Sequence, residues 1–259
     1  MVIKLYISPC PNDTFMFDAL INGRIDTRGL AFDVEYLDIE ELNSRALEGE
    51  AHISKISCAL LPAIGESYKL CGCGAALGRG NGPLLVRRRG ERGPLKSVAV
   101  PGVHTTANAL MTKLFPQIDD RHAVLFSEVA ARVESGDFDC GVLIHEGRFV
   151  YQNRDLELVA DLGELWEERT GLPLPLGGIV MRNDLGEEIH ATFEKVLSQS
   201  VEYAFANPQA SREYIKSHAQ ELDDEVIDSH IRLFVNKYSL SLGEDGREAL
   251  KLFGAKIDS

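Results

Sequence analysis

The amino-acid sequence contains no run of about 18 apolar residues, which is roughly the shortest stretch that spans a membrane as a helix. We therefore expect no transmembrane segment. The chain begins with MVIKLYISPCPND, which carries one lysine and a short apolar stretch. It lacks the long hydrophobic region and the small-residue cleavage site of a secretory signal. These two absences predict a cytoplasmic protein.

Basic residues are scarce. Lysine and arginine number 27 against 40 aspartates and glutamates, so the formal net charge is −13. This deficit argues against a nucleic-acid-binding protein, which usually presents a basic face, and against attachment to anionic lipid. Cysteine is also rare, and the five cysteines are odd in number and scattered, as is typical of reduced thiols in the cytosol. We expect neither nucleic acid nor a membrane as a partner.

The remaining composition is that of a globular protein. The chain has 259 residues, of which 44% are hydrophobic and 26% charged. This length is enough for one large domain or two modest ones, with a core that needs no disulfide or metal. Apolar stretches of strand length alternate with amphipathic stretches of helix length, a pattern that predicts an α/β fold with parallel sheets covered by helices.

The strands and helices fall into two series, which predict two α/β lobes. In the first series we expect strands at 2–8, 30–37, 52–57 and 84–86, and helices at 13–21, 38–47 and 58–64. In the second we expect strands at 97–101, 123–126, 140–144 and 156–160, and helices at 105–114, 127–135 and 162–170. A charged segment at 87–96 and a Gly/Pro-rich segment at 171–182 are the expected connections. Lobe 1 then comprises residues 1–92 and 175–259, with helices at its C-terminal end, and lobe 2 comprises residues 93–174.

Four polar turns follow predicted strands, at 8–14, 54–57, 104–106 and 145–146. Ligands of open α/β sheets bind beyond the carboxyl ends of the strands, and each predicted lobe supplies two of these turns. We therefore expect the four turns to converge on one cleft between the lobes. Ser8, Asn12 and His104 are candidates for its lining. Asn12 is also a favourable N-cap, so a rigid turn and a capped helix explain the first motif equally well.

His145 and the pair Thr105–Thr106 are the strongest candidates for chemistry. His145 follows the apolar run at 141–144, which places an imidazole at the end of a buried strand, where it can serve as a base. From the pattern alone, a histidine bonded to a loop carbonyl is the more common interpretation, and His104 is a weaker candidate of the same kind. Thr105 and Thr106 begin a predicted helix, whose free N–H groups can bind an anion or can simply be capped.

Other features give no sign of a cofactor. The glycine-rich segment at 78–82 leads into a predicted strand, so it lacks the geometry of a phosphate loop. Cys71 and Cys73 have no second pair of ligands for zinc. We expect no metal, nucleotide or flavin. The five remaining histidines are interpreted as ordinary surface or core residues: His52, His122, His190, His218 and His230.

Several long motifs resemble those of one enzyme family. They are SPCPNDTFMFDAL from residue 8, GAALGRGNGPLLV from residue 74, VPGVHTTA from residue 100, LIHEGRFVY from residue 143 and WEERTGLPLPLG from residue 166. In this order, over nearly the whole chain, they resemble 1,4-dihydroxy-6-naphthoate synthases of the futalosine route to menaquinone. The resemblance implies a two-lobe fold like that of type II periplasmic binding proteins, with a central cleft.

The same resemblance implies a cofactor-independent carbon–carbon lyase that converts cyclic dehypoxanthinyl futalosine to 1,4-dihydroxy-6-naphthoate. It makes His145 the proton acceptor and places Lys55, Ile56, Ser57, Thr105 and Thr106 against the substrate. The substrate carries a carboxylate, for which Lys55 and a helix N-terminus are alternative binding groups. The resemblance assigns no role to Asn12, Arg79 or Glu146 and no oligomeric state.

Two other functions fit the same fold class. One is a cytoplasmic protein that binds a small anion without chemistry, because the fold class is mainly used for binding. The other is chorismate dehydratase, a sister enzyme of the same pathway. The SPCPNDT opening and the LIHE segment favour the synthase, and a histidine in the cleft favours catalysis over binding alone.

Overall fold

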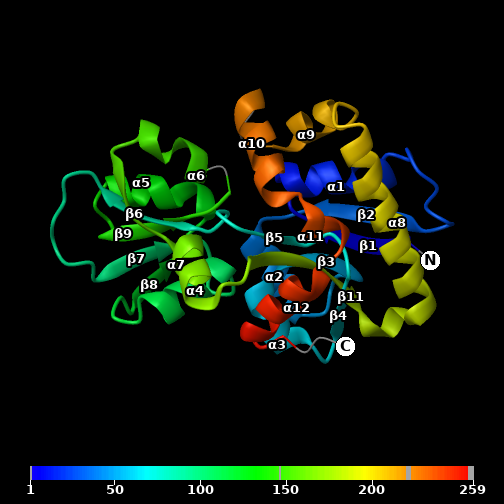
Figure 1. Ribbon diagram of the computed structural model, residues 1–259, viewed down its shortest axis with the longest axis horizontal. Helices are drawn as coiled ribbons and strands as arrows, with labels where there is room; N and C mark the ends of the chain where they lie inside the picture. Colours follow the sequence, from blue (N-terminus) through cyan, green and yellow to red (C-terminus); the bar gives the residue numbers. More distant parts are fainter. Residues whose placement is uncertain (1, 146, 220–222, 256–259) are drawn as a thin grey trace.

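A computed structural model describes residues 2–145, 147–219 and 223–255, which form two α/β lobes side by side (Figure 1). The sheet of the first lobe has the order β2 (Ala31–Tyr36), β1 (Val2–Ile7), β3 (Ile53–Ser57), β11 (Leu174–Arg182), β4 (Tyr68–Leu70), with β5 (Ala76–Gly78) also paired to β11. The sheet of the second lobe has the order β10 (Leu156–Asp161), β6 (Leu84–Arg88), β9 (Cys140–Leu143), β7 (Ser97–Val100), β8 (Asp120–Ala123).

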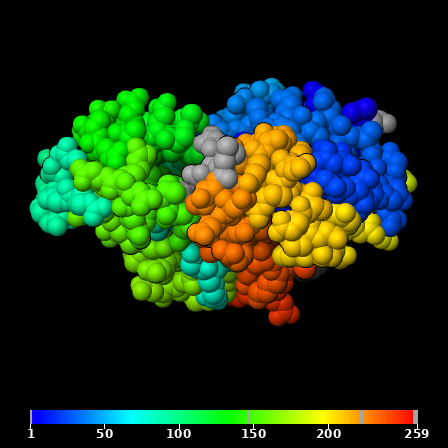
Figure 2. All heavy atoms as spheres, turned by 90° about the horizontal axis from the view of Figure 1, so that it is seen from above, coloured from blue at the N-terminus to red at the C-terminus, as the bar shows by residue number. Residues whose placement is uncertain are grey.

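Helices cover both sheets. Those of the first lobe are α1 (Pro11–Ile21), α2 (Ile39–Leu47), α3 (Leu61–Ile64), α8 (Glu187–Ala206), α9 (Arg212–His218), α10 (Asp224–Phe234), α11 (Lys237–Leu240) and α12 (Gly243–Leu252). Those of the second lobe are α4 (Thr106–Leu114), α5 (Val129–Glu134), α6 (Gly147–Val150) and α7 (Leu162–Thr170). Figure 2 shows that both ends of the chain, blue and orange to red, build one lobe, while the middle of the chain, green, builds the other.

Local sequence signals explain several boundaries. The Asp38 side chain caps α2 as expected, accepting from the backbone N–H groups of Glu40 at 2.7 Å and Glu41 at 3.0 Å. Helix α7 spans the predicted residues and stops at Gly171, whose φ of 70° suits glycine. The C-terminal part of the chain is helical as expected, and α8 buries the predicted apolar face against the first sheet except for Phe205, which is 42% exposed.

The expectation of purely parallel sheets is wrong, because both sheets are mixed. Strands β2, β1 and β3 run parallel, whereas β11 is antiparallel to β3, β4 and β5. In the second sheet β7 is parallel to β8 and β9, whereas β6 is antiparallel to β9 and β10. Strands β6 and β11 directly follow the two crossings between the lobes. Each of them therefore enters its sheet from the side of the other lobe and is antiparallel to the strands next to it.

The first crossing lies earlier in the chain than we expected. The sequence pattern predicts strand β6 in lobe 1, but β6 pairs with β9 and β10 in the second sheet, so the chain crosses at 79–83 and not in the charged segment at 87–96. The charged segment at 87–96 is instead the end of β6 and the loop to β7. The expected strand at 123–126 is also displaced, because β8 ends at Ala123 and a short helical turn, Phe126–Glu128, follows.

No helix in the described part of the chain is both long and apolar enough to cross a membrane.

Candidate active site

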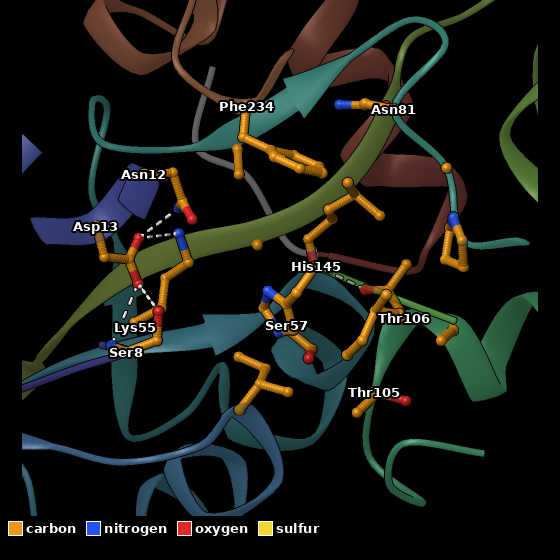
Figure 3. A pocket seen from close by; sticks show the side chains of 18 of the residues that line it. Ser8, Asn12, Asp13, Lys55, Ser57, Asn81, Thr105, Thr106, His145 and Phe234 are labelled. Carbon is orange, nitrogen blue, oxygen red and sulfur yellow. Dashed lines mark hydrogen bonds and ion pairs between the residues drawn. The ribbon is translucent and has the colours of Figure 1, made fainter. Parts of the chain in front are cut away.

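A cleft between the lobes gathers most of the predicted site residues. It holds about 680 Å³ of space outside the atoms, its open mouth included, which is within the usual size of a small-molecule site. The predicted residues that line it are Ser8, Asn12, Lys55, Ser57, Thr105, Thr106 and His145. They come from both lobes and from the four polar turns (Figure 3). The predicted convergence of these turns is therefore confirmed, although Glu146 lies outside the described residues.

Two predicted residues do not line the cleft. Ile56 is completely buried among apolar side chains of the first lobe. It lies between Lys55 and Ser57 on β3, and successive side chains of a strand point to opposite faces, so only its neighbours reach the cleft. His104 is held away by Glu40 on α2, whose Oε1 lies 2.7 Å from His104 Nδ1. The backbone N–H groups of Val103 and His104 also donate to this carboxylate, so the cluster joins the two lobes.

Asp13 organises the wall of the cleft in the first lobe. Its carboxylate is fully buried and accepts from Lys55 Nζ at 2.9 Å and Asn12 Nδ2 at 2.8 Å on Oδ1, and from Ser8 Oγ at 2.7 Å on Oδ2 (Figure 3). The Lys55 ammonium is therefore already neutralised by an ion pair. The sequence showed Asp13 only as part of the SPCPNDT turn, since its partner Lys55 lies 42 residues away.

His145 projects into the cleft from the loop after β9. Its backbone φ is 52°, a left-handed conformation that is rare for a residue with a side chain and that recurs at functional sites. Its Nδ1 atom lies 3.3 Å from the thiol of Cys10, and its ring meets the edge of Phe126 with centroids 4.9 Å apart. These contacts from both lobes hold the imidazole in one orientation.

Hydrogen-bond donors gather where α4 begins. The hydroxyls of Thr105 and Thr106 donate to the carbonyls of Gly102 and Leu176, both at 2.8 Å, so neither hydroxyl proton remains for a ligand. The N–H groups of Thr106 and Ala107 lie in the first turn of α4, where a helix provides no backbone acceptor. Both residues line the cleft, which makes this helix end a set of donors beside it.

Ser57 adds a donor next to this helix end. Its Oγ accepts from Asn43 Nδ2 at 3.0 Å, and its backbone N–H donates to Asn43 Oδ1 at 2.8 Å. The hydroxyl proton is therefore left for another acceptor. The backbone N–H of Ala59 donates to Thr106 Oγ1 at 3.4 Å, which shows that the end of β3 and the start of α4 are adjacent.

The cleft is also lined by residues outside the predicted set. They include Asn81, Arg148, His230 and Phe234. Arg148 donates to the carbonyl of Gly82 and pairs with Asp161 at 3.4 Å, and its burial lowers the pKa of its guanidinium. The sequence indicates an ordinary surface or core histidine at His230, but the side chain lies in the cleft wall. Asn81 and Arg148 lie within the motifs that begin at residues 74 and 143, whereas no motif of the sequence includes His230 or Phe234.

Comparison with known proteins identifies the family. The profile of a family described as menaquinone biosynthesis matches residues 3–258. This chain belongs to the menaquinone biosynthesis family. It is 42% identical over 262 residues to a protein of Thermus thermophilus named 1,4-dihydroxy-6-naphthoate synthase, with 99% of this chain and 94% of that protein covered. It is also 42% identical over 258 residues to a Streptomyces coelicolor protein of the same name, with 96% of this chain and 90% of that protein covered.

Solved structures confirm the fold of this menaquinone biosynthesis family member. A crystal structure of a protein from Archaeoglobus fulgidus superposes with a TM-score of 0.92 at 32% identity and covers 98% of this chain and 95% of that one. A Candida albicans protein described as having the generic periplasmic binding protein fold superposes with a TM-score of 0.71 at 13% identity, covering 100% of this chain and 92% of that one. The predicted two-lobe fold with a central cleft is confirmed.

Proposed function

We propose that this chain is a 1,4-dihydroxy-6-naphthoate synthase that converts cyclic dehypoxanthinyl futalosine by breaking a carbon–carbon bond without a cofactor. Its family and the names of its two relatives support the assignment. The geometric observation that carries it is His145, an imidazole held by both lobes inside the cleft. A protein that only binds an anion has no need of a base in this position. The cytoplasmic location stays a prediction.

His145 is the base in this proposal. Its imidazole takes the proton of a sugar hydroxyl, the electron pair of that O–H bond forms the second bond of a carbonyl, and the adjacent carbon–carbon bond breaks with its electron pair passing to the ring fragment. The sugar-derived remainder leaves as the second product and takes up the proton from the imidazolium. The ring fragment becomes an aromatic dihydroxynaphthalene, and aromatisation makes the overall reaction favourable. The protein has to supply a base, to orient the substrate and to exclude water. A cleft with a half-buried His145 and fixed donors on both lobes meets these needs.

We assign the substrate carboxylate to the start of α4 and to Ser57. Of the two alternatives left by the sequence, Lys55 is the weaker, because Asp13 already pairs with its ammonium at 2.9 Å. The N–H groups of Thr106 and Ala107 carry the positive end of the helix dipole, which favours an anion. The Ser57 hydroxyl proton completes the set of donors.

One assay tests the proposed function against both alternatives. Purified protein is incubated with cyclic dehypoxanthinyl futalosine, and the absorbance of dihydroxynaphthoate is followed, with chorismate as substrate in a parallel reaction. We expect dihydroxynaphthoate from the first reaction and no consumption of chorismate in the second. Consumption of chorismate identifies a dehydratase, and binding of either compound in calorimetry without conversion identifies a binding protein. Both of these outcomes contradict the proposal.

Replacing Ser57 by alanine is expected to raise KM by about 10- to 100-fold with a smaller change in kcat. A hydrogen bond to a charged group contributes about 1.5–3 kcal/mol, and about 1.4 kcal/mol corresponds to a factor of ten. Steady-state kinetics measure the effect. The matched control is Ser54→Ala on the same strand, where the hydroxyl donates to the Lys55 carbonyl at 2.9 Å and does not line the cleft. A KM in Ser57→Ala equal to that of the control removes Ser57 from the carboxylate site.

Treatment with a chelator is expected to leave the activity unchanged. The proposed step needs only proton transfer and hydrogen bonding, which side chains of the cleft supply. Within residues 2–145, 147–219 and 223–255, no three histidine, cysteine, aspartate or glutamate side chains gather as a metal site. The measurement is turnover before and after dialysis against EDTA. Loss of turnover that a single metal ion restores contradicts the prediction.

A further inference from the structure

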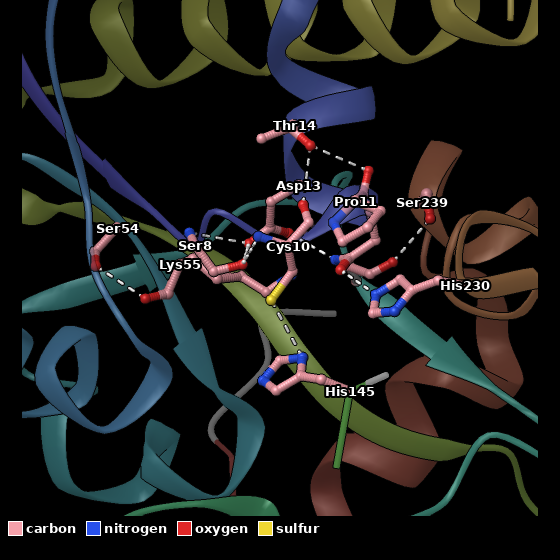
Figure 4. A network of polar contacts seen from close by, with 12 residues as sticks. Ser8, Cys10, Pro11, Asp13, Thr14, Ser54, Lys55, His145, His230 and Ser239 are labelled. Carbon is pink, nitrogen blue, oxygen red and sulfur yellow. Dashed lines mark hydrogen bonds and ion pairs between the residues drawn. The ribbon is translucent and has the colours of Figure 1, made fainter. Parts of the chain in front are cut away.

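A second histidine, His230 on α10, lies in the wall of the cleft opposite His145. Its side chain is fully buried, and its ring is parallel to that of His145 within 3°, with centroids 6.3 Å apart. The ring of Phe234, one turn later on α10, packs against it with centroids 4.6 Å apart. The two imidazoles therefore approach the same space from different lobes (Figure 4).

A chain of hydrogen bonds fixes which nitrogen of His230 carries the proton. The Asp13 carboxylate can only accept, so the Asn12 side chain turns its NH₂ group toward Asp13 Oδ1, at 2.8 Å. Asn12 Oδ1 consequently faces His230 Nε2, at 2.9 Å. An amide oxygen can only accept, so Nε2 is the protonated nitrogen of His230.

The other nitrogen, Nδ1, is consequently an acceptor. Burial, His145 and Lys55 hold the pKa of His230 well below its ordinary value, so the imidazole stays neutral and Nδ1 keeps a free electron pair. Across the described residues, Nδ1 has no hydrogen-bond partner. A buried acceptor without a partner destabilises the fold, and a ligand that donates a hydrogen bond removes this cost.

We propose that His230 Nδ1 accepts a hydrogen bond from a hydroxyl group of the substrate, and that Asn12 and Asp13 hold it in the required tautomer. The inference rests on the proposed function and extends it. The free electron pair on His230 Nδ1 attracts a hydroxyl group and repels a carboxylate. The protein therefore distinguishes the hydroxyl-bearing end of the substrate from its carboxylate end. The hydroxyl-bearing sugar end lies against α1 and α10, and the carboxylate lies against α4 on the other lobe. His145, whose ring centroid lies 6.3 Å from that of His230, is the base for the bond that breaks.

Two substitutions separate the two nitrogens of His230. In His230→Gln, the side-chain NH₂ group replaces Nε2–H toward Asn12, while the acceptor at Nδ1 is lost. In His230→Asn, an amide oxygen can occupy the position of Nδ1. We expect about a tenfold or larger loss of kcat/KM in His230→Gln and a smaller loss in His230→Asn. Substrate analogues that each lack one sugar hydroxyl extend the test: wild-type enzyme discriminates against one of them about tenfold, and His230→Gln does not.

His190 provides the matched control. It is a buried histidine of α8 that does not line the cleft, and its Nε2 lies 2.9 Å from the Arg182 carbonyl. Among the described residues its Nδ1 has no hydrogen-bond partner, and Glu187 Oε1 lies 4.0 Å from it. His190→Gln is expected to keep the wild-type kcat/KM. Two results contradict the inference. One is a wild-type kcat/KM in His230→Gln, and the other is a discrimination by His230→Gln against the analogues that equals that of the wild-type enzyme. A wild-type protein that does not convert the substrate contradicts the proposed function itself, which is a separate result.

A spectroscopic measurement on His230 avoids any dependence on the stability of these variants. We expect the ¹⁵N resonance of Nδ1 to be that of an unprotonated nitrogen in the free protein. It should shift when cyclic dehypoxanthinyl futalosine binds to the His145→Ala enzyme, which holds the substrate with little turnover. A protonated Nδ1, or a resonance that does not move on binding, overturns the inference.

Discussion

Replacing His145 by alanine is expected to lower kcat by about 10²–10⁴, the usual contribution of a positioned acid–base group. The imidazole lies in the cleft with its Nδ1 3.3 Å from Cys10 Sγ, and the proposed reaction begins with transfer of a hydroxyl proton to it. Steady-state turnover of cyclic dehypoxanthinyl futalosine measures the loss. Substrate affinity and thermal stability should change little, because the apolar residues of β9, which precede the histidine, provide the packing.

The pH profile provides a further criterion for His145. Acid protonates an imidazole and removes its capacity to accept a proton, so kcat/KM of the wild-type enzyme should fall on the acid side. This acid limb should be absent from the residual activity of His145→Ala. His104→Ala is the matched control, because His104 pairs with Glu40 away from the cleft lining. Near-normal turnover by His145→Ala would make His145 a structural residue.

Replacing Asp13 by alanine is expected to lower the free energy of unfolding by about 3–5 kcal/mol, the usual effect of removing one partner of a buried ion pair. Lys55 is 5% exposed, so its ammonium would be left with little water and without its counter-charge. The backbone N–H and hydroxyl of Ser8 would also lose their acceptor. Urea denaturation of the variant and the wild-type protein measures the difference.

Glu187→Ala is the control for the Asp13 prediction. It removes an ion pair with Lys69 whose side chains are 40% and 82% exposed, and such pairs contribute about 0–1 kcal/mol. The two variants therefore compare a buried pair with a solvated pair in the same protein. If Asp13→Ala loses no more stability than Glu187→Ala, the Asp13–Lys55 pair does not stabilise the first lobe.

The amino-acid sequence by itself determined most of the secondary structure and which turns line the cleft. Alternating apolar strands and amphipathic helices predicted an α/β fold, and the capping aspartate at Asp38 predicted the start of α2. Polar residues after strands predicted which turns meet, because the ends of strands lie at one edge of a sheet. This rule located Ser57, Thr106 and His145 correctly. The motif resemblance included Ile56 in error, because it does not take the alternation of side chains along a strand into account.

Only the tertiary structure decided how distant segments meet. Strand direction depends on the path between the lobes, so the antiparallel β6 and β11 and the crossing at 79–83 had no local signature. The contacts that tune the site join Cys10 to His145 across 135 residues and Asn12 to His230 across 218. Hydrogen bonding and desolvation act over a few ångströms in space and independently of separation along the chain. The ion pair of Lys55 and the tautomer of His230 were therefore decided by the folded neighbours of these side chains.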